Sequence, residues 1–280
     1  MTLSEEILTG RLIYLWMIEN CCSSLSPETI HSPSFCLENT RWNIALVHNI
    51  YHVALRIYRE MDDGMDQVEI EFDFCFFSSD DVAMCKEKQQ LCLKRGDFFE
   101  TVFKVHSIDI FRHRNKEFLS NDALTIRCRA FLIGSDTEKV HFRCARTRLG
   151  LERRVFFWRI ENFSSLQPGQ EIKYRIDPIA SWCPSTTLIL EFPTSDQVCV
   201  HFMDNSGVVI PKYALSMCAL DETGTNYAAY HFLHSISCDG RLIFQQRKSL
   251  MPVRNLMKDD VLTLKCYLEI TIGPLWNGFE

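Results

Sequence analysis

Cysteine and histidine are the residues of this chain with the greatest chemical potential. The 280-residue sequence holds 13 cysteines and 9 histidines, and a thiolate beside an imidazole base is an effective covalent nucleophile. Such a pair forms in space, and the spacing along the chain does not indicate one. Many of the cysteines lie inside apolar runs, where a free thiol behaves as a small buried hydrophobic residue. We predict no catalytic residues and no enzyme, with a cysteine hydrolase as the alternative.

Metal and cofactor sites are also not indicated. His231 and His234 lie three residues apart, a spacing that on a helix could share a metal ion. The residues from 227 to 237 have the composition of a strand, in which positions three apart face opposite sides. Glycine patterns that bind phosphate or dinucleotides are absent from the sequence. We therefore predict no metal and no cofactor.

The most distinctive local feature is Phe98-Phe99, which follows Arg95-Gly96-Asp97. One interpretation is a loop at the edge of a groove, with an aromatic platform and a carboxylate offered to a peptide. The other is one buried phenylalanine beside a turn-forming aspartate. The sequence leaves both open.

Charge and hydropathy exclude several classes of protein. The net charge of −6 argues against a nucleic-acid partner, because such proteins usually carry a basic excess. No apolar stretch approaches the ~20 residues of a membrane span. The cysteines form no Cys-x-x-Cys pair or regular framework, and Glu5 and Glu6 precede any apolar run. These features predict an intracellular protein of a reducing compartment, without a membrane partner.

A short apolar hexamer near the N-terminus defines the elements that must position any site. Leu15–Asn20 contains Trp16 and Ile18, and Phe157–Asn162 repeats it about half a chain later with Trp158 and Ile160. Alternate residues of a strand point the same way, so each Trp/Ile pair would share one buried face. We predict that these four residues anchor two cores in a duplicated chain.

The segments between the hexamers alternate polar and apolar residues with turn signals every ~8 to 15 positions, which is typical of antiparallel β-sheets. Residues 107–115 are a short helix or an irregular crossing. The predicted organisation is all-β: a first domain at 9–134, a linker at 135–152, a second domain at 153–273 and a tail at 274–280. The linker is rich in arginine, and it is either solvated or a docking strip for an acidic partner.

These repeated features resemble the MATH, or TRAF-like, domains. The resemblance lies in a strand with Trp-x-Ile-x-Asn at the start of each domain and a closing strand, Asp122–Cys128 in the first copy and Asp260–Cys266 in the second. Tandem MATH proteins of arthropods, related to the speckle-type POZ proteins, are similar. The resemblance implies two antiparallel eight-stranded β-sandwiches in tandem. It also implies a shallow groove for short extended peptides.

The resemblance also implies groove residues, although this chain departs from the family at most of them. In the first domain the corresponding positions are Arg56, Phe72, Gln90, Asp97 and Phe98, of which Arg56 and Gln90 replace aromatic residues. Phe72 is alternatively a core residue. In the second domain they are Leu215 and Asp239. The peptide class bound by the known relatives therefore does not transfer.

The predicted function is a non-catalytic adaptor that binds a protein or peptide in extended conformation. By the resemblance, it would present substrates to a cullin-type ubiquitin ligase for proteasomal degradation. No BTB/POZ segment follows Ile272 in this sequence, so ligase components would be reached through a partner. The alternative is a TRAF-like scaffold that associates with itself and has no ligase role, although no coiled-coil heptad supports it.

Overall fold

Alternating apolar residues give this chain its strands, and β-strands dominate the computed structural model, so the all-β class is confirmed. The structure describes residues 11–21, 29–48, 52–78, 80, 82–134, 140–183, 185–194, 197–204, 212–234, 242–246, 250 and 256–279. The chain divides into two units. Unit 1 contains residues 1–149 and 273–280, and unit 2 contains residues 150–272. Among the described residues, no helix is long and apolar enough to cross a membrane.

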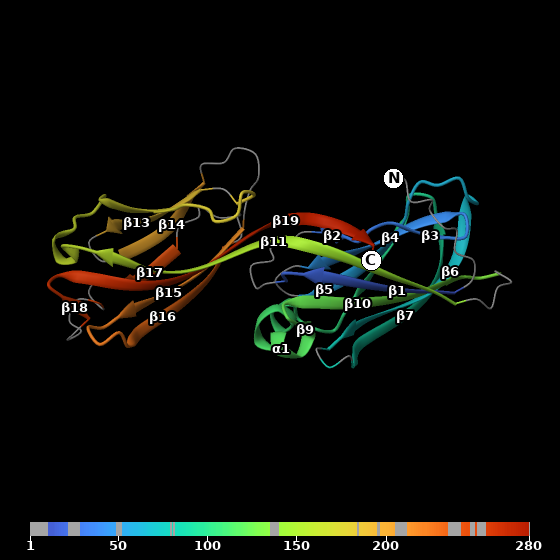
Figure 1. Cartoon of the computed structure of the whole chain (residues 1–280), viewed down its shortest axis with the longest axis horizontal. Coiled ribbons are helices and arrows are strands. Elements are labelled where there is room, and N and C mark those ends of the chain that lie inside the picture. The colour runs from blue at the N-terminus through green and yellow to red at the C-terminus, as the bar shows by residue number, and fades with distance from the viewer. Residues whose placement is uncertain are drawn as a thin grey trace. The chain divides into compact units, whose positions relative to one another are not determined.

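Unit 1 has two sheets (Figure 1). The first has the order β11-β1-β10-β6-β7, with β1 antiparallel to β10 and parallel to β11. The second has the order β2-β4-β5-β8, and β3 also pairs with β4. The elements are β1 (Arg11–Glu19), β2 (Thr29–His31), β3 (Phe35–Leu37), β4 (Thr40–His48), β5 (Val53–Arg59), β6 (Gln67–Phe77), β7 (Ala83–Lys94), β8 (Phe98–Val102), a π-helix (Asp109–His113), α1 (Asn115–Phe118), β9 (Leu119–Ser120), β10 (Ala123–Leu132) and the first part of β11 (Val140–Ile160).

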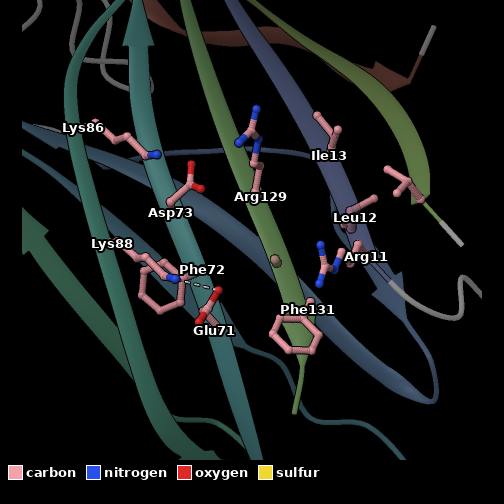
Figure 2. A pocket seen from close by; sticks show the side chains of 12 residues that line it. Arg11, Leu12, Ile13, Glu71, Phe72, Asp73, Lys86, Lys88, Arg129 and Phe131 are labelled. Carbon is pink, nitrogen blue, oxygen red and sulfur yellow. Dashed lines mark ion pairs between the residues drawn. The ribbon is translucent and has the colours of Figure 1, made fainter. Parts of the chain in front are cut away.

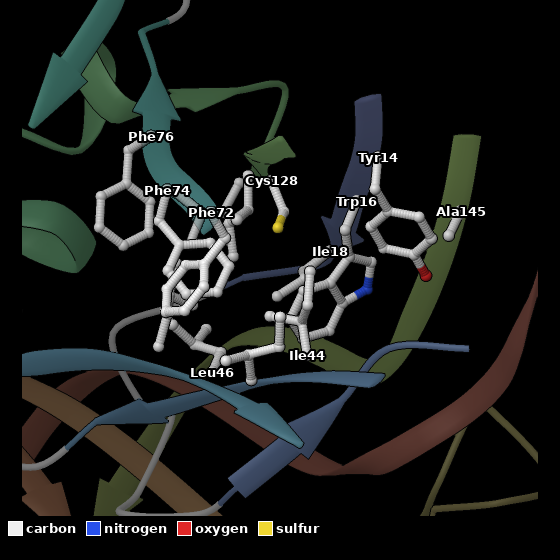
Figure 3. Close-up of a cluster of buried hydrophobic side chains, with 14 of the residues drawn as sticks. Tyr14, Trp16, Ile18, Ile44, Leu46, Phe72, Phe74, Phe76, Cys128 and Ala145 are labelled. Carbon is white, nitrogen blue, oxygen red and sulfur yellow. The ribbon is translucent and has the colours of Figure 1, made fainter. Parts of the chain in front are cut away.

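The core of unit 1 lies between these two sheets. In β1 every second residue is buried, Trp16 and Ile18 among them. They pack in one cluster with Phe72 and Phe74 from β6 and with Ile44 and other residues of the second sheet, as Figure 3 shows. Trp16 and Ile18 are fully buried, so both are core anchors, as the hexamer predicts.

Unit 2 contains the second core. Trp158, Ile160 and Leu215 are buried there in one cluster. One sheet has the order β12-β13-β14-β17, and β16, β15, β19 and β11 follow one another in the other. The elements are the second part of β11, a 3-10 helix (Phe163–Ser165), β12 (Glu171–Ile176), β13 (Thr186–Thr194), β14 (Gln197–Asp204), β15 (Lys212–Leu220), β16 (Asn226–His234), β17 (Leu242–Gln246), β18 (Met257–Lys258) and β19 (Val261–Phe279).

The two units repeat a specific turn geometry after their tryptophan strands. Asn20 and Asn162 both have positive φ, at 62° and 53°. The residue after Asn20, Cys21, donates its backbone N–H to the Asp122 carbonyl at 2.8 Å. Phe163 donates in the same way to the Asp260 carbonyl at 3.1 Å. Asp122 and Asp260 are themselves in the left-handed region and directly precede the closing strands. The duplicated sequence thus forms duplicated local structure.

The segment expected to be a linker at 135–152 is a strand from Val140 onward, and the first part of it belongs to unit 1. Its arginines explain the difference. Arg146 and Arg148 both form ion pairs with Glu19 of β1, at 3.1 and 2.7 Å. These two arginines therefore pair across strands with Glu19, and Arg148 keeps its exposure to solvent.

The expected tail at 274–280 also differs from the structure, because residues 273–279 continue β19 and belong to unit 1. A chain of hydrogen bonds holds them there. The Trp16 indole N–H donates to the Thr147 hydroxyl at 2.8 Å, and that hydroxyl donates to Asn277 Oδ1 at 2.7 Å. The Asn277 amide donates to the His31 carbonyl at 3.3 Å. The finer prediction of two eight-stranded sandwiches stays a prediction.

The Trp16–Thr147 hydrogen bond makes a testable contribution to unit 1. Replacing Thr147 by valine keeps the shape but leaves the buried indole N–H without its acceptor. We expect the free energy of unfolding to fall by about 1–3 kcal/mol. Chemical denaturation measures this, with Thr125→Val on the outer face as control. Equal stability of both variants would contradict the assigned role.

Trp158 should be equally important for unit 2. The ring is 2% exposed, so Trp158→Ala removes a large buried side chain and leaves a cavity. We expect a loss of about 3–5 kcal/mol in unit 2. A thermal melt unchanged by the substitution would contradict the assignment of Trp158 as a core anchor.

Candidate functional site

A cluster of aromatic and charged side chains lies on the outer face of unit 1's second sheet. β5 and β8 pair antiparallel, and their register places Phe98 opposite Tyr58 and Glu100 opposite Arg56. All four side chains share one face because the positions alternate along both strands. We name these four residues, with His31 from β2, the Phe98 patch.

Arg56 organises the patch. Its Nε donates to Glu100 Oε2 at 2.5 Å and its Nη1 donates to the Tyr58 hydroxyl at 3.2 Å. Its guanidinium carbon lies 5.1 Å from the centre of the Phe98 ring, a cation–π distance. The hydrogen bonds with Tyr58 and Glu100 raise the pKa of Arg56, so the guanidinium is charged at any physiological pH.

The rings form a continuous surface across three strands. Tyr58 lies 5.2 Å from Phe98 and 5.4 Å from His31, measured between ring centres. His31 is held in turn by Asn43, whose Oδ1 lies 3.1 Å from its Nδ1. Phe98 is 52% exposed. A half-exposed phenylalanine supported by a tyrosine and an arginine is suited to contact an apolar side chain of a ligand.

The patch borders an edge of the sheet, because β8 ends the strand order in the part of the chain that the structure describes. The Arg59 N–H donates to the Asp97 carbonyl at 2.9 Å, and the Phe103 N–H donates to the Val53 carbonyl at 3.0 Å. In an antiparallel pair, successive residues alternate between facing the partner strand and facing away from it. Because Asp97 and Phe103 bond to β5, the backbone N–H and C=O of Phe98, Glu100 and Val102 point away from β5. They are therefore oriented to pair with an added strand.

Arg59 fixes the turn that carries Phe98. Its side chain is buried, and Nη1 donates to the carbonyls of Leu93 and Asp66 at 3.0 and 3.2 Å. Nη2 forms an ion pair with Asp62 at 3.2 Å and also donates to the Met65 carbonyl. The Arg59 N–H donates to the Asp97 carbonyl and the Gly96 N–H donates to the Arg59 carbonyl. Gly96 has φ +80°, which favours glycine.

The structure separates the groove residues expected in the first domain. Arg56 and Phe98 meet in the patch. Asp97 is the turn former: its carboxylate accepts the Lys94 N–H at 3.0 Å. Phe72 is 1% exposed and packs against Phe74 with ring centres 5.1 Å apart, so it is a core residue. Gln90 lies on β7 of the other sheet, where it donates to Glu69 at 3.0 Å.

Of the two residues expected in the second domain, the structure describes only Leu215. Leu215 is buried in the core of unit 2, because the apolar alternation of β15 directs it inward. Asp239 lies outside the described residues, as does the side chain of His231. Unit 1 therefore carries the candidate site.

Three important residues were missed from the sequence. Tyr58 follows Arg56 by two positions, so strand alternation already places both on one face, and this signal was available. His31 lies on a strand of only three residues and gives no such signal. The buried role of Arg59 depends on contacts with carbonyls far along the chain, which no local pattern reveals.

Thiol chemistry has weak support in the described residues. The ten cysteines described form no disulfide bonds. Burial raises the pKa of Cys183 and of Cys266 to about 12, and burial also raises that of Cys128, so these thiols stay protonated at neutral pH. Within the described ranges, no group of three or more His, Cys, Asp or Glu side chains is arranged to hold a metal ion.

Comparison with known proteins adds little. No family model matches the chain, and no curated protein matches it. One similar solved structure is a crystal structure of a BuGH86 variant in complex with neoagarooctaose, with a TM-score of 0.20 and 8% identity. The match covers 88% of this chain and 34% of that one, so this chain spans about a third of that protein's length. At such a TM-score the likeness carries no argument about fold or function.

The Arg59–Asp62 ion pair predicts sensitivity to acid. Burial raises the pKa of Asp62, but hydrogen bonds from Arg59, Arg41 and Gly64 outweigh it and lower the pKa below its usual value. In the unfolded chain the pKa of an aspartate carboxyl is about 3.9. The stabilisation is therefore complete above that pH and is lost as the pH falls through the lower folded-state pKa.

Asp62→Asn should lower the free energy of unfolding at neutral pH by about 2–4 kcal/mol, because Arg59 stays buried without its counter-charge. Its unfolding free energy should also depend less on pH below about 4. Urea denaturation across this pH range measures both effects. Asp63→Asn, at an exposed neighbouring position, is the control, and identical behaviour of the two variants would contradict the role of the ion pair.

Proposed function

We propose that the protein is a non-catalytic peptide-binding adaptor, and that unit 1 holds an extended peptide segment at the Phe98 patch. The observation that carries this proposal is the coincidence of the patch with the open edge of β8. Strand addition supplies affinity through backbone hydrogen bonds, and side chains beside the edge supply selectivity. Arg56, Tyr58 and Phe98 stand at the position required for the second role.

The composition of the edge supports a binding role. Proteins usually protect edge strands with lysine, proline or bulges, because an open edge pairs with other chains. In β8, Phe98 and Val102 are both about half exposed, and the charged residue between them, Glu100, is neutralised by Arg56. An apolar and neutralised edge favours the addition of a strand.

Preorganisation favours the same conclusion. The guanidinium of Arg56 is held by two hydrogen bonds and stacks on Phe98, so little side-chain freedom remains to be lost on binding. The turn before β8 is fixed by Arg59. A ligand that contacts Phe98 therefore meets a surface that is already ordered.

The proposal includes the family assignment expected from the sequence. The shared turn geometry of Asn20 and Asn162, and the buried Trp16 and Trp158, support two MATH-like sandwiches in tandem. By that resemblance the adaptor would pass its bound protein to a cullin-type ubiquitin ligase through a BTB-bearing partner. Self-association through the β8 edge, as in a TRAF-like scaffold, is the alternative.

A peptide-array screen followed by fluorescence anisotropy tests the peptide-binding role. Phe98→Ala should weaken the best peptide by about tenfold, the typical effect of removing an aromatic anchor. Arg56→Ala should weaken it as well, because Phe98 and Tyr58 lose their support. Phe157→Ala is the matched control, since Phe157 is 58% exposed but lies in unit 2.

Two results would contradict the proposal. One is a set of peptides whose binding is unchanged by Phe98→Ala and Arg56→Ala. The other is a dimer in light scattering that Phe98→Ala dissociates while no peptide binds, which would assign the edge to self-association.

A further inference from the structure

The other sheet of unit 1, with the order β11-β1-β10-β6-β7, carries a second surface feature that is not part of the Phe98 patch. A cavity of about 430 Å³ opens on the outer face of this sheet, over β7, β6, β10, β1 and the start of β11. Figure 2 shows the side chains that line it, with Arg11, Lys86, Lys88 and Arg129 among them. The chain as a whole has a net charge of −6, so four cations in one cavity are a local reversal of its charge.

The two carboxylates in this cavity already have partners. Glu71 forms an ion pair with Lys88 at 2.9 Å. Asp73 lies 3.7 Å from Arg127, which also stands over the Phe77 ring. Both acids are therefore compensated from within the sheet.

Three cations remain without an acidic partner among the described residues. The described ion pairs include none with Arg11, Lys86 or Arg129, and all three residues are exposed. Arg11 stacks on Phe131, with its guanidinium carbon 5.6 Å from the ring centre. Strand register relates these cations: Arg129 faces Asp73 on β6, and Asp73 in turn faces Lys88 on β7. The cations therefore surround the middle of the cavity from both sides.

Apolar side chains form one wall of the same cavity. Phe131 lies opposite Arg11 on β10, and Val140, which is 58% exposed, lies opposite Arg11 on β11. A ligand in this cavity meets positive charge from Lys86, Arg129 and Arg11 and an apolar surface from Phe131 and Val140, which flank Arg11. A simple anion would use only the first of these.

The arrangement selects among anionic partners. A nucleic-acid backbone carries a charge on every phosphate, so some phosphates would lie against Glu71 and Asp73, which stand between the cations. An extended peptide places successive side chains of one face, which are two residues apart, about 6.4–6.8 Å from each other. Its carboxylates can thus contact separate cations while a neighbouring apolar residue contacts Phe131 and Val140.

We propose that this cavity is a docking site for an acidic segment of a partner protein, in which carboxylates at alternate positions are followed by an apolar residue. The site is independent of the Phe98 patch because it lies on the other sheet of unit 1. It would allow the protein to hold a second protein segment at the same time as a peptide at β8.

The test uses the full chain and a short labelled peptide that alternates glutamate and threonine and ends in leucine. Fluorescence anisotropy should show binding that weakens with added salt, because the contacts are exposed. The double variant Arg11→Gln and Arg129→Gln should weaken binding by about tenfold or more. A double variant of the exposed Lys104 and Lys116 to glutamine removes the same charge elsewhere in unit 1, and it should bind like the unaltered chain, as should Phe98→Ala.

Each contrary result is specific. Equal binding of a glutamine-for-glutamate peptide, or an equal loss in the Lys104/Lys116 variant, would overturn the site. If inorganic phosphate displaces the labelled peptide at the same concentration as unlabelled peptide does, the cavity is an anion site without peptide selectivity. If single-stranded DNA binds more tightly than the peptide, the cavity is a nucleic-acid site. Both would refute the proposal, and unchanged thermal melts of the variants exclude unfolding as the cause of any loss.

Discussion

The buried indole N–H of Trp16 is the constraint on which much of unit 1 depends. A polar group without a partner is costly in a dry core, and the hydroxyl of Thr147 is the acceptor that removes this cost. That hydroxyl can serve Trp16 only if the start of β11 lies beside β1, in parallel register. Because Thr147 then donates to Asn277, the end of β19 is fixed to the same place. One side chain of the first strand thus orders segments from the middle and the end of the chain.

This constraint also explains why the strands were predictable while the division of the chain was not. Alternation is local, so it indicates β1 and buries Trp16 and Ile18 correctly. The β1–β11 pairing is long-range, and the signal at 140–149 is dominated by arginines that suggest solvent. Only the partner strand supplies Glu19, which neutralises Arg146 and Arg148. Charge patterning along one strand cannot show a counter-charge that lies on another.

The candidate site also has a part that the sequence could predict and a part that depends on the whole unit. Arg56 and Phe98 belong to neighbouring strands whose register brings them together, so a family pattern could predict both. Alternation places Phe72 on the apolar face of β6 while the family pattern places it in the groove, and its 1% exposure shows that it is a core residue. Gln90 lies on an outer face, as expected, but of the other sheet. Sequence patterns identify faces of strands well, whereas the sheet to which a strand belongs is a property of the whole unit.

Buried and exposed charges have different roles in unit 1, and the difference underlies the two proposed binding surfaces. Arg59 is buried, so its hydrogen bonds to carbonyls and to Asp62 are made at folding and hold the turn before β8 rigid. Arg56 is half-buried and already paired with Glu100, so it shapes the Phe98 patch without attracting anions. Arg129 is exposed and forms no ion pair with an acid that the structure describes, which leaves its charge available to a ligand. A surface whose cations are satisfied is suited to recognition by shape and stacking, and one whose cations are unsatisfied is suited to recognition by charge.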